Sequence, residues 1–166
     1  MSQLQMLYGQ VLANVIAVTI LFLCWKRRTA GRLSLVLLFL WAGLYNLRAA
    51  FVNPDQYRMY ARLASFTWYQ TFIRGFFAEH TTAVVASIAL GQLTAAVLLS
   101  MRGLAVYLGL AGAIISLVAI APLGSGSAFP STLIAACGAI LLLQYNYDIT
   151  LLGELRNALK HHQVTS

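Results

Sequence analysis

The sequence contains little charge. Only 9% of its 166 residues are Asp, Glu, Lys or Arg, whereas 60% are hydrophobic. A soluble domain carries about 25% charged residues, so this deficit argues against a chain whose main solvent is water. Acidic residues are the scarcest, with 4 against 11 Lys and Arg, and the net charge is +7. The basic residues lie at the ends of apolar runs and form no long tract, which indicates membrane topology and disfavours nucleic-acid binding.

Cysteine and histidine are too few and too scattered to suggest a disulfide framework or a metal centre. Cys24 and Cys137 belong to no CxxC pair. A haem ligand inside the membrane would be a histidine within an apolar run, and His80 lies at the end of one. Glu79 and His80 are neighbours and would point about 100° apart on a helix. The sequence therefore predicts no metal site, no catalytic set and no cofactor of the protein's own.

Long apolar runs dominate what is present, and each approaches the roughly 20 residues that a membrane-spanning helix needs. We expect an all-α, polytopic transmembrane helix bundle of about five spans, with residues 1–166 forming a single domain. The predicted spans are residues 7–25, 33–51, 83–101, 104–121 and 131–147. We expect residues 148–166 to form a cytoplasmic helical tail, with the fifth span able to continue as helix towards Lys160.

Basic residues predict the orientation of the bundle. Lys26, Arg27, Arg28 and Arg32 follow the first span and form the densest basic cluster, which the positive-inside rule assigns to a cytoplasmic loop. No basic region precedes the first span, the reverse of a cleaved secretory signal, so we expect this span to be retained. Five spans then place the N-terminus outside and the C-terminus in the cytoplasm.

Residues 53–80, between the second and third spans, are too polar to cross a membrane easily and too aromatic for a solvated linker. The sequence Asn53-Pro54-Asp55 favours a turn at the start. Charged residues together with Trp and Tyr suit the zone where hydrocarbon meets water. We therefore expect one or two interfacial helices that lie on the outer leaflet.

Polar side chains of this outer region are the candidate binding residues. Arg48 lies near the outer end of the second span, where a charge needs water or a polar partner. Glu79, at the start of the third span, is its expected ion-pair partner, and an Arg48 that simply extends to the membrane surface is the alternative. The candidates for holding the head group of a quinone or a lipid are Arg48, Tyr57, Arg58 and His80.

Small residues predict that the third and fourth spans pack closely. Gly91, Gly109 and Gly112 lie within these apolar runs, and small residues let the backbones of membrane helices approach each other. Gln92, the only strongly polar residue in the interior of the third span, is placed to hydrogen-bond a neighbouring helix.

Residues about 36 to 143 resemble the DoxX-like family of small bacterial membrane proteins. The resemblance is carried by Gly43 and Arg48 in the second span, Pro54 and Tyr57 after it, the pair Gly91-Gln92, and the loop PLGSGSAFPSTL at residues 122–133. Two features depart from the family pattern. The family usually has four spans, whereas an additional N-terminal span is expected here, and Arg48 stands where the family usually has a lysine nearer its glycine.

The resemblance implies a protein of the bacterial inner membrane that works with redox partners, since members include thiosulfate:quinone oxidoreductase subunits. The first hypothesis is an accessory subunit of a membrane protein complex, with the lipid bilayer and other membrane subunits as partners. The second is a quinone-binding or catalytic subunit of a membrane oxidoreductase, in which a bound quinone or lipid occupies the outer region. A small-solute transporter is disfavoured, because no inverted repeat and no buried acid pair is visible.

Overall fold

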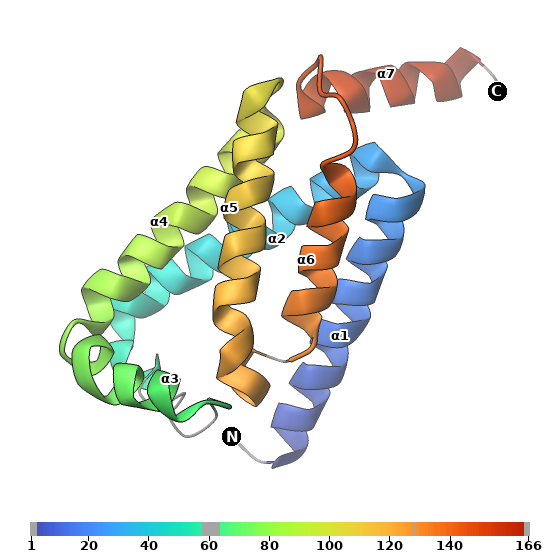
Figure 1. The fold of residues 1–166 in the computed structure, drawn as a ribbon. Helices are drawn as coiled ribbons and strands as arrows, with labels where there is room; N and C mark the ends of the chain where they lie inside the picture. The colour runs from blue at the N-terminus through green and yellow to red at the C-terminus, as the bar shows by residue number, and fades with distance from the viewer. Residues whose placement is uncertain (1–2, 58–63, 128, 165–166) are drawn as a thin grey trace.

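The computed structural model describes residues 3–57, 64–127 and 129–164, and every regular element in these ranges is a helix (Figure 1). In chain order the long helices are α1 (Gln3–Lys26), α2 (Arg28–Val52), α4 (Thr81–Ser100), α5 (Leu104–Ile120), α6 (Ser131–Leu142) and α7 (Leu151–Val164). Shorter elements are α3 (Thr67–Phe72), the π-helical turn η2 (Ile73–Phe77) and the 3-10 segment η3 (Ala121–Ser127). The predicted all-α helix bundle is confirmed.

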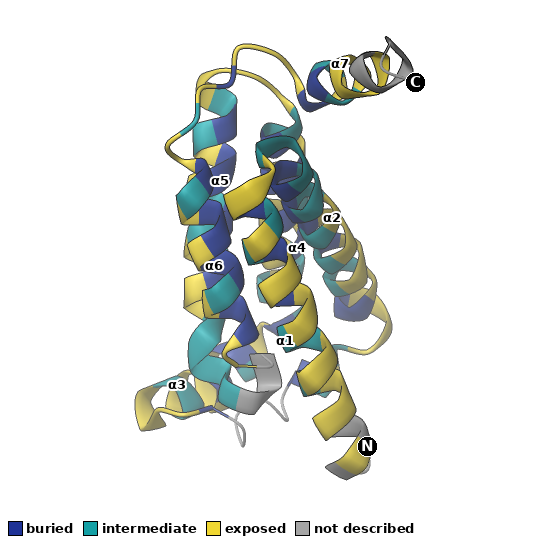
Figure 2. Cartoon of the chain, turned by 90° about the vertical axis from the view of Figure 1, so that its right-hand side faces the viewer, coloured by how far each residue is buried: buried dark blue, intermediate teal, exposed yellow. Residues whose placement is uncertain are grey.

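Among the residues that the structure describes, four helical segments are long and apolar enough to cross a membrane: Leu7–Lys26, Arg28–Val52, Thr81–Ser100 and Leu104–Gly124. Their outward faces carry large exposed apolar side chains, among them Leu37, Leu90 and Ile115 (Figure 2). Such a surface is stable when lipid surrounds it, because lipid tails are as apolar as these side chains. The prediction of a membrane-embedded protein is therefore supported by the fold.

Helix α6 is shorter than the predicted fifth span at residues 131–147. Its 12 residues extend about 18 Å at 1.5 Å per residue, less than the roughly 30 Å of a bilayer core. The helix does not continue towards Lys160, because the backbone beyond it bonds to α5 instead. Gly103 N–H donates to the Tyr147 carbonyl at 2.7 Å, and the Tyr107 hydroxyl donates to the Tyr145 carbonyl at 2.8 Å.

The helices of the bundle alternate in direction, so that its two ends differ (Figure 1). At one end, called the α3 end, lie the start of α1, the segments α3 and η2, and the start of α6. At the other, called the α7 end, the α1–α2 connection lies near α7, which crosses the end of the bundle (Figure 1). The expected helical tail is thus a helix folded against the bundle, with Leu151 and Glu154 both buried.

The segment between α2 and α4, expected to be interfacial, forms α3 and η2 across the α3 end (Figure 1). Aromatic residues of this segment are largely exposed, including Phe66, Trp68 and Phe76. Two of its arginines, Arg58 and Arg62, lie outside the described residues. The position and composition of the described part suit the interface between hydrocarbon and water.

Candidate functional site

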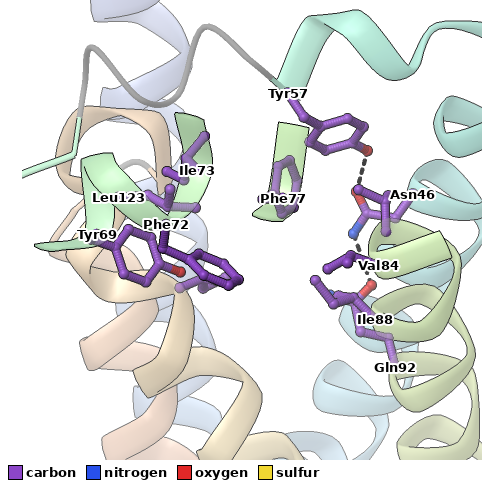
Figure 3. Close-up of a pocket in the computed structure, with 12 residues that line it drawn as sticks. Asn46, Tyr57, Tyr69, Phe72, Ile73, Phe77, Val84, Ile88, Gln92 and Leu123 are labelled. Atoms are coloured by element: carbon purple, nitrogen blue, oxygen red, sulfur yellow. Dashed lines mark hydrogen bonds between the residues drawn. The ribbon is translucent and has the colours of Figure 1, made fainter. Parts of the chain in front are cut away.

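Three polar side chains from three separate segments form a hydrogen-bonded chain near the α3 end (Figure 3). The Tyr57 hydroxyl donates to Asn46 Oδ1 at 2.8 Å. Asn46 Nδ2 in turn donates to Gln92 Oε1 at 2.9 Å. Asn46 lies on α2 and Gln92 on α4, so the chain joins two membrane-spanning helices and the turn that follows the first of them.

A glycine in α2 brings the two helices close enough for this contact. A Cβ atom at Gly43 would lie 2.8 Å from the Leu93 side chain and 3.1 Å from the Ala89 carbonyl. Both neighbours belong to α4 and flank Gln92 along that helix. Residues three apart share a helix face, so Asn46 faces α4 as Gly43 does and reaches the Gln92 amide.

These polar groups lie at the wall of a cavity of about 310 Å³, which we call the site pocket (Figure 3). Its other lining residues are aromatic or aliphatic: Tyr69, Phe72, Ile73, Phe77, Val84, Val85, Ile88, Ile120 and Leu123. A mostly apolar pocket of this size with a few convergent polar groups is the usual form of a small-molecule site. None of the described residues that line it carries a formal charge.

The side-chain amide of Gln92 ends this series of hydrogen bonds, and its nitrogen is available as a donor. Its residue is 6% exposed, and its Oε1 accepts from Asn46, while Nε2 donates to none of the described residues. A ligand with a suitably placed acceptor can therefore receive a hydrogen bond from this amide, and a hydrogen bond of this kind contributes about 0.5–1.5 kcal/mol. Tyr69, on the opposite side of the pocket (Figure 3), already donates to the Ala119 carbonyl at 3.2 Å, and burial raises the pKa of its phenol.

A second polar cluster lies at the α7 end and is ionic. Arg32, on α2, is completely buried, and its Nη1 lies 3.2 Å from Glu154 Oε1 on α7. Arg28 Nη2 lies 3.2 Å from the same carboxylate oxygen. Oε2 of Glu154 has no partner among the described residues. The guanidinium of Arg32 also lies 4.9 Å from the centre of the Tyr147 ring, and burial raises the pKa of Tyr147 to about 12.

Arg32 also caps the end of α4. Its Nε donates to the Leu99 carbonyl at 2.6 Å, and its Nη2 donates to the Met101 carbonyl. The last carbonyls of a helix lack partners within the helix, so the guanidinium satisfies groups that would otherwise be buried unpaired. The ionic cluster therefore ties α2, α4 and α7 together, which is a structural role.

This position of Arg32 corrects the sequence prediction. Arg28 and Arg32 were expected in a solvated loop before a span at residues 33–51, but α2 begins at Arg28 and only Arg27 separates it from α1. The two helices can turn this sharply because a Cβ at Gly31 would lie 2.5 Å from Cys24 Cα, an approach that glycine alone permits. Arg28 and Arg32 of the basic cluster thereby lie in helix α2, and Arg32 is buried in the bundle.

The predicted head-group residues are not brought together. Tyr57 is buried and lines the site pocket, whereas Arg48 and His80 are exposed. His80 stacks on Phe76 with ring centres 4.7 Å apart, and its Nδ1 lies 3.1 Å from the Phe76 carbonyl. The remaining member of the predicted set, Arg58, lies outside the described residues.

The expected ion pair between Arg48 and Glu79 is not formed. Both side chains are exposed, and the ion pairs found within the described ranges are those that Glu154 makes with Arg28 and Arg32. At an exposed position each charge can be solvated separately, so neither residue needs the other.

The predicted packing residues differ in what surrounds them. A Cβ at Gly109 would lie 2.8 Å from the Leu99 backbone nitrogen, so α5 and α4 are in close contact there. At Gly112 the nearest atom would be Ala95 Cβ at 3.9 Å, an ordinary contact, and at Gly91 there is open space. Gly91 therefore packs against no other helix in the described part of the chain. Its neighbour Gln92 is buried and bonds to Asn46 of α2 at the wall of the site pocket.

Asn46 is the member of the site that the sequence prediction did not name. The available signal was its amide side chain within an otherwise apolar run, the same signal that drew attention to Gln92. No group of three or more His, Cys, Asp or Glu that could hold a metal occurs among the described residues.

Comparison with known proteins gives no match: no family model, no curated protein and no solved structure is similar to this chain. The resemblance to the DoxX-like family therefore stays a prediction. The function has to be argued from the site itself.

Proposed function

We propose that this protein is a membrane subunit that binds a neutral, hydrophobic molecule with a carbonyl head group, and that a quinone is such a molecule. The observation that carries the proposal is a chain of neutral polar groups at the wall of an apolar cavity, which ends at Gln92 Nε2, an amide nitrogen that donates to none of the described residues. A quinone carbonyl accepts a hydrogen bond, and its ring and substituents suit an aromatic and aliphatic lining.

The lining favours a neutral ligand over a charged one. Moving an ion into a site without a countercharge carries a large desolvation penalty, and the described residues around the pocket supply none. The candidate head-group arginine Arg48 is exposed and lies outside the lining. Exposed arginines such as Arg48, near the α3 end, are better suited to bind lipid phosphates.

The proposed role is that of an accessory subunit in a redox-related complex, with the redox centre in another subunit. In this role the site pocket would hold the quinone while a partner exchanges electrons with it. Quinone binding without a partner protein is the part that the geometry supports best, and it can be tested first.

The test is a binding titration of the purified protein in mild detergent with 2,3-dimethoxy-5-methylbenzoquinone, which lacks a tail. We expect Gln92→Leu to weaken binding about tenfold, because one net hydrogen bond of about 1.4 kcal/mol is lost. The control is Gln10→Leu, which alters an amide on α1 that does not line the site pocket. Equal affinity in the wild type and Gln92→Leu would overturn the proposal.

We further propose that the protein lies in the bacterial inner membrane with the α7 end in the cytoplasm. The basic residues Lys26, Arg27, Arg28, Arg102, Arg156 and Lys160 lie in α7 or where helices meet its end of the bundle, as the positive-inside rule requires. In a variant without native cysteines, a cysteine at Ser2 should react with an impermeant reagent on intact cells, and one at Ser166 should not. Labelling in the reverse pattern would contradict this orientation.

A further inference from the structure

A second cavity, which we call the inner cavity, lies between α1, α2, α5 and α6 and has a volume of about 410 Å³. Its walls are almost entirely apolar and include Leu12, Ile16 and Ile20 from α1 and Phe39 from α2. The lining on α1 extends from Gly9 to Ile20, which is about 16 Å along the helix axis. The cavity is thus long, apolar and parallel to the membrane-spanning helices.

One hydroxyl in this wall is buried without a partner among the described residues. Thr132 is 7% exposed, and its Oγ1 has no hydrogen-bond partner among the described residues. Threonine hydroxyls in membrane helices commonly donate to the carbonyl one turn earlier, as Thr19 does to Val15 at 2.8 Å. Thr132 lines the inner cavity, and its hydroxyl remains a buried donor without a partner among the described residues.

The position of Thr132 along the bundle indicates the kind of ligand. It is the second residue of α6, which starts at the α3 end, whereas Ile20 and Phe39 line the cavity deeper in the bundle. The ester groups of membrane lipids lie at the boundary between the head groups and the hydrocarbon core. A hydrogen-bond donor near a helix end, followed by an apolar channel, matches an ester carbonyl followed by its hydrocarbon chain.

We propose that the inner cavity binds one ester-linked acyl chain of a membrane glycerolipid, with the Thr132 hydroxyl donating to the ester carbonyl. The chain lies along α1, and the head group remains outside the cavity at the α3 end. This inference goes beyond quinone binding and does not depend on it. Gln92 and Ile120 line both cavities, so the bound chain packs against the wall of the site pocket.

The experiment compares two lipids that differ only in the bond to the chain: a dioleoyl phosphatidylglycerol and its diether analogue, which lacks the carbonyls. The purified full-length protein is incubated with an equal mixture in detergent, and native mass spectrometry measures how much of each lipid it retains. We expect the wild type to retain the ester lipid about fivefold better, as one hydrogen bond of about 1 kcal/mol predicts. Thr132→Val should abolish this preference, and Thr19→Val, which changes an exposed threonine on α1, should not.

A second pair of variants tests whether the chain occupies the cavity at all. Ala13 is half-buried and lines the inner cavity, so Ala13→Phe should lower retention of both lipids several-fold. Ile115→Phe adds the same bulk at a side chain that is 68% exposed and should leave retention unchanged. Undiminished retention in Ala13→Phe would overturn the proposal, as would an ester preference that persists in Thr132→Val. Finding a quinone in place of the lipid in the wild type, and not in Ala13→Phe, would also overturn it.

Discussion

The two ends of the bundle bury polar groups in different ways. At the α7 end, buried Arg32 is paired with Glu154 and caps the carbonyls of Leu99 and Met101. At the α3 end, the hydrogen-bonded side chains of Tyr57, Asn46 and Gln92 are neutral and lie beside a cavity, and Gln92 Nε2 donates to none of the residues that the structure describes. The first arrangement compensates buried charges and holds helices together, whereas the second is neutral and borders a cavity that has room for a ligand.

The buried charges of this bundle hold helices together, whereas the neutral amides Asn46 and Gln92 lie at the candidate site. A buried charge must be compensated at once, because removing one partner of a buried pair is strongly destabilising. A neutral amide left with one unpaired donor costs much less. A site that is to remain open in the absence of its ligand is therefore more easily built from amides than from ions.

The largest expected effect comes from removing the buried ion pair at the α7 end. Glu154→Gln removes the negative charge and leaves Arg32 buried without compensation, so we expect the free energy of unfolding to fall by about 3–5 kcal/mol. Thermal unfolding in detergent measures this loss. The control is Asp148→Asn, at an exposed side chain near α7, which should change stability little. Equal stability of Glu154→Gln and the wild type would show that α7 is not held by this ion pair.

A smaller effect tests the close packing of α4 and α5 at Gly109. The control is Gly91, which looks similar in the sequence but has open space around it. Gly109→Ala places a Cβ 2.8 Å from the Leu99 nitrogen, so the helices must separate, whereas Gly91→Ala meets open space. We expect Gly109→Ala to lower the free energy of unfolding by about 1–3 kcal/mol, and Gly91→Ala to be neutral or slightly stabilising, since alanine favours helix. A destabilised Gly91→Ala would instead mean that α4 packs there against another molecule.

The smallest expected effect is a pH dependence of stability that comes from Tyr147 at the α7 end. Burial raises the pKa of Tyr147 from its ordinary value of 10.0 to about 12, so the folded protein keeps the phenol neutral after the unfolded chain has ionised it. Tyr147 therefore stabilises the fold fully below pH 10, and this contribution is lost as the pH rises from about 10 to about 12. Unfolding midpoints across this range should fall less steeply in Tyr147→Phe than in Tyr45→Phe, whose parent side chain is exposed. Equal slopes in the two variants would contradict the effect.

Much of the fold was predictable because membrane helices are encoded by long local patterns. The apolar runs around residues 83–101 and 104–121 coincide closely with α4 and α5. The fifth span was overestimated because Leu143, Tyr145 and Tyr147 extend the run past Leu142. The helix ends there because the Tyr145 and Tyr147 carbonyls accept hydrogen bonds from the start of α5. Contacts between distant segments decide that end, and hydropathy does not contain them.

The site was only partly predictable, because it also depends on contacts between segments that are distant in the sequence. Gln92 and Tyr57 were among the named residues, but their connection runs through Asn46, and the helix approach at Gly43 that allows it is a tertiary feature. Arg32 looked like a loop residue because its partner, Glu154, is 122 residues away. The local sequence around a charged residue at the end of an apolar run does not show whether its side chain lies in solvent or inside the bundle.

The most direct test of the contrast between the two ends is the shift in thermal unfolding midpoint on adding the tail-less benzoquinone. A ligand that binds only the folded protein stabilises it by about 2.7 kcal/mol at a concentration 100 times its Kd. We expect Glu154→Gln to unfold at a much lower temperature and yet gain the same increment from the quinone as the wild type. Gln92→Leu should retain most of the stability of the wild type and lose most of the increment. If the quinone stabilises Gln92→Leu as much as the wild type, or if Glu154→Gln alone loses the increment, the assignment of structure to one end and binding to the other is wrong.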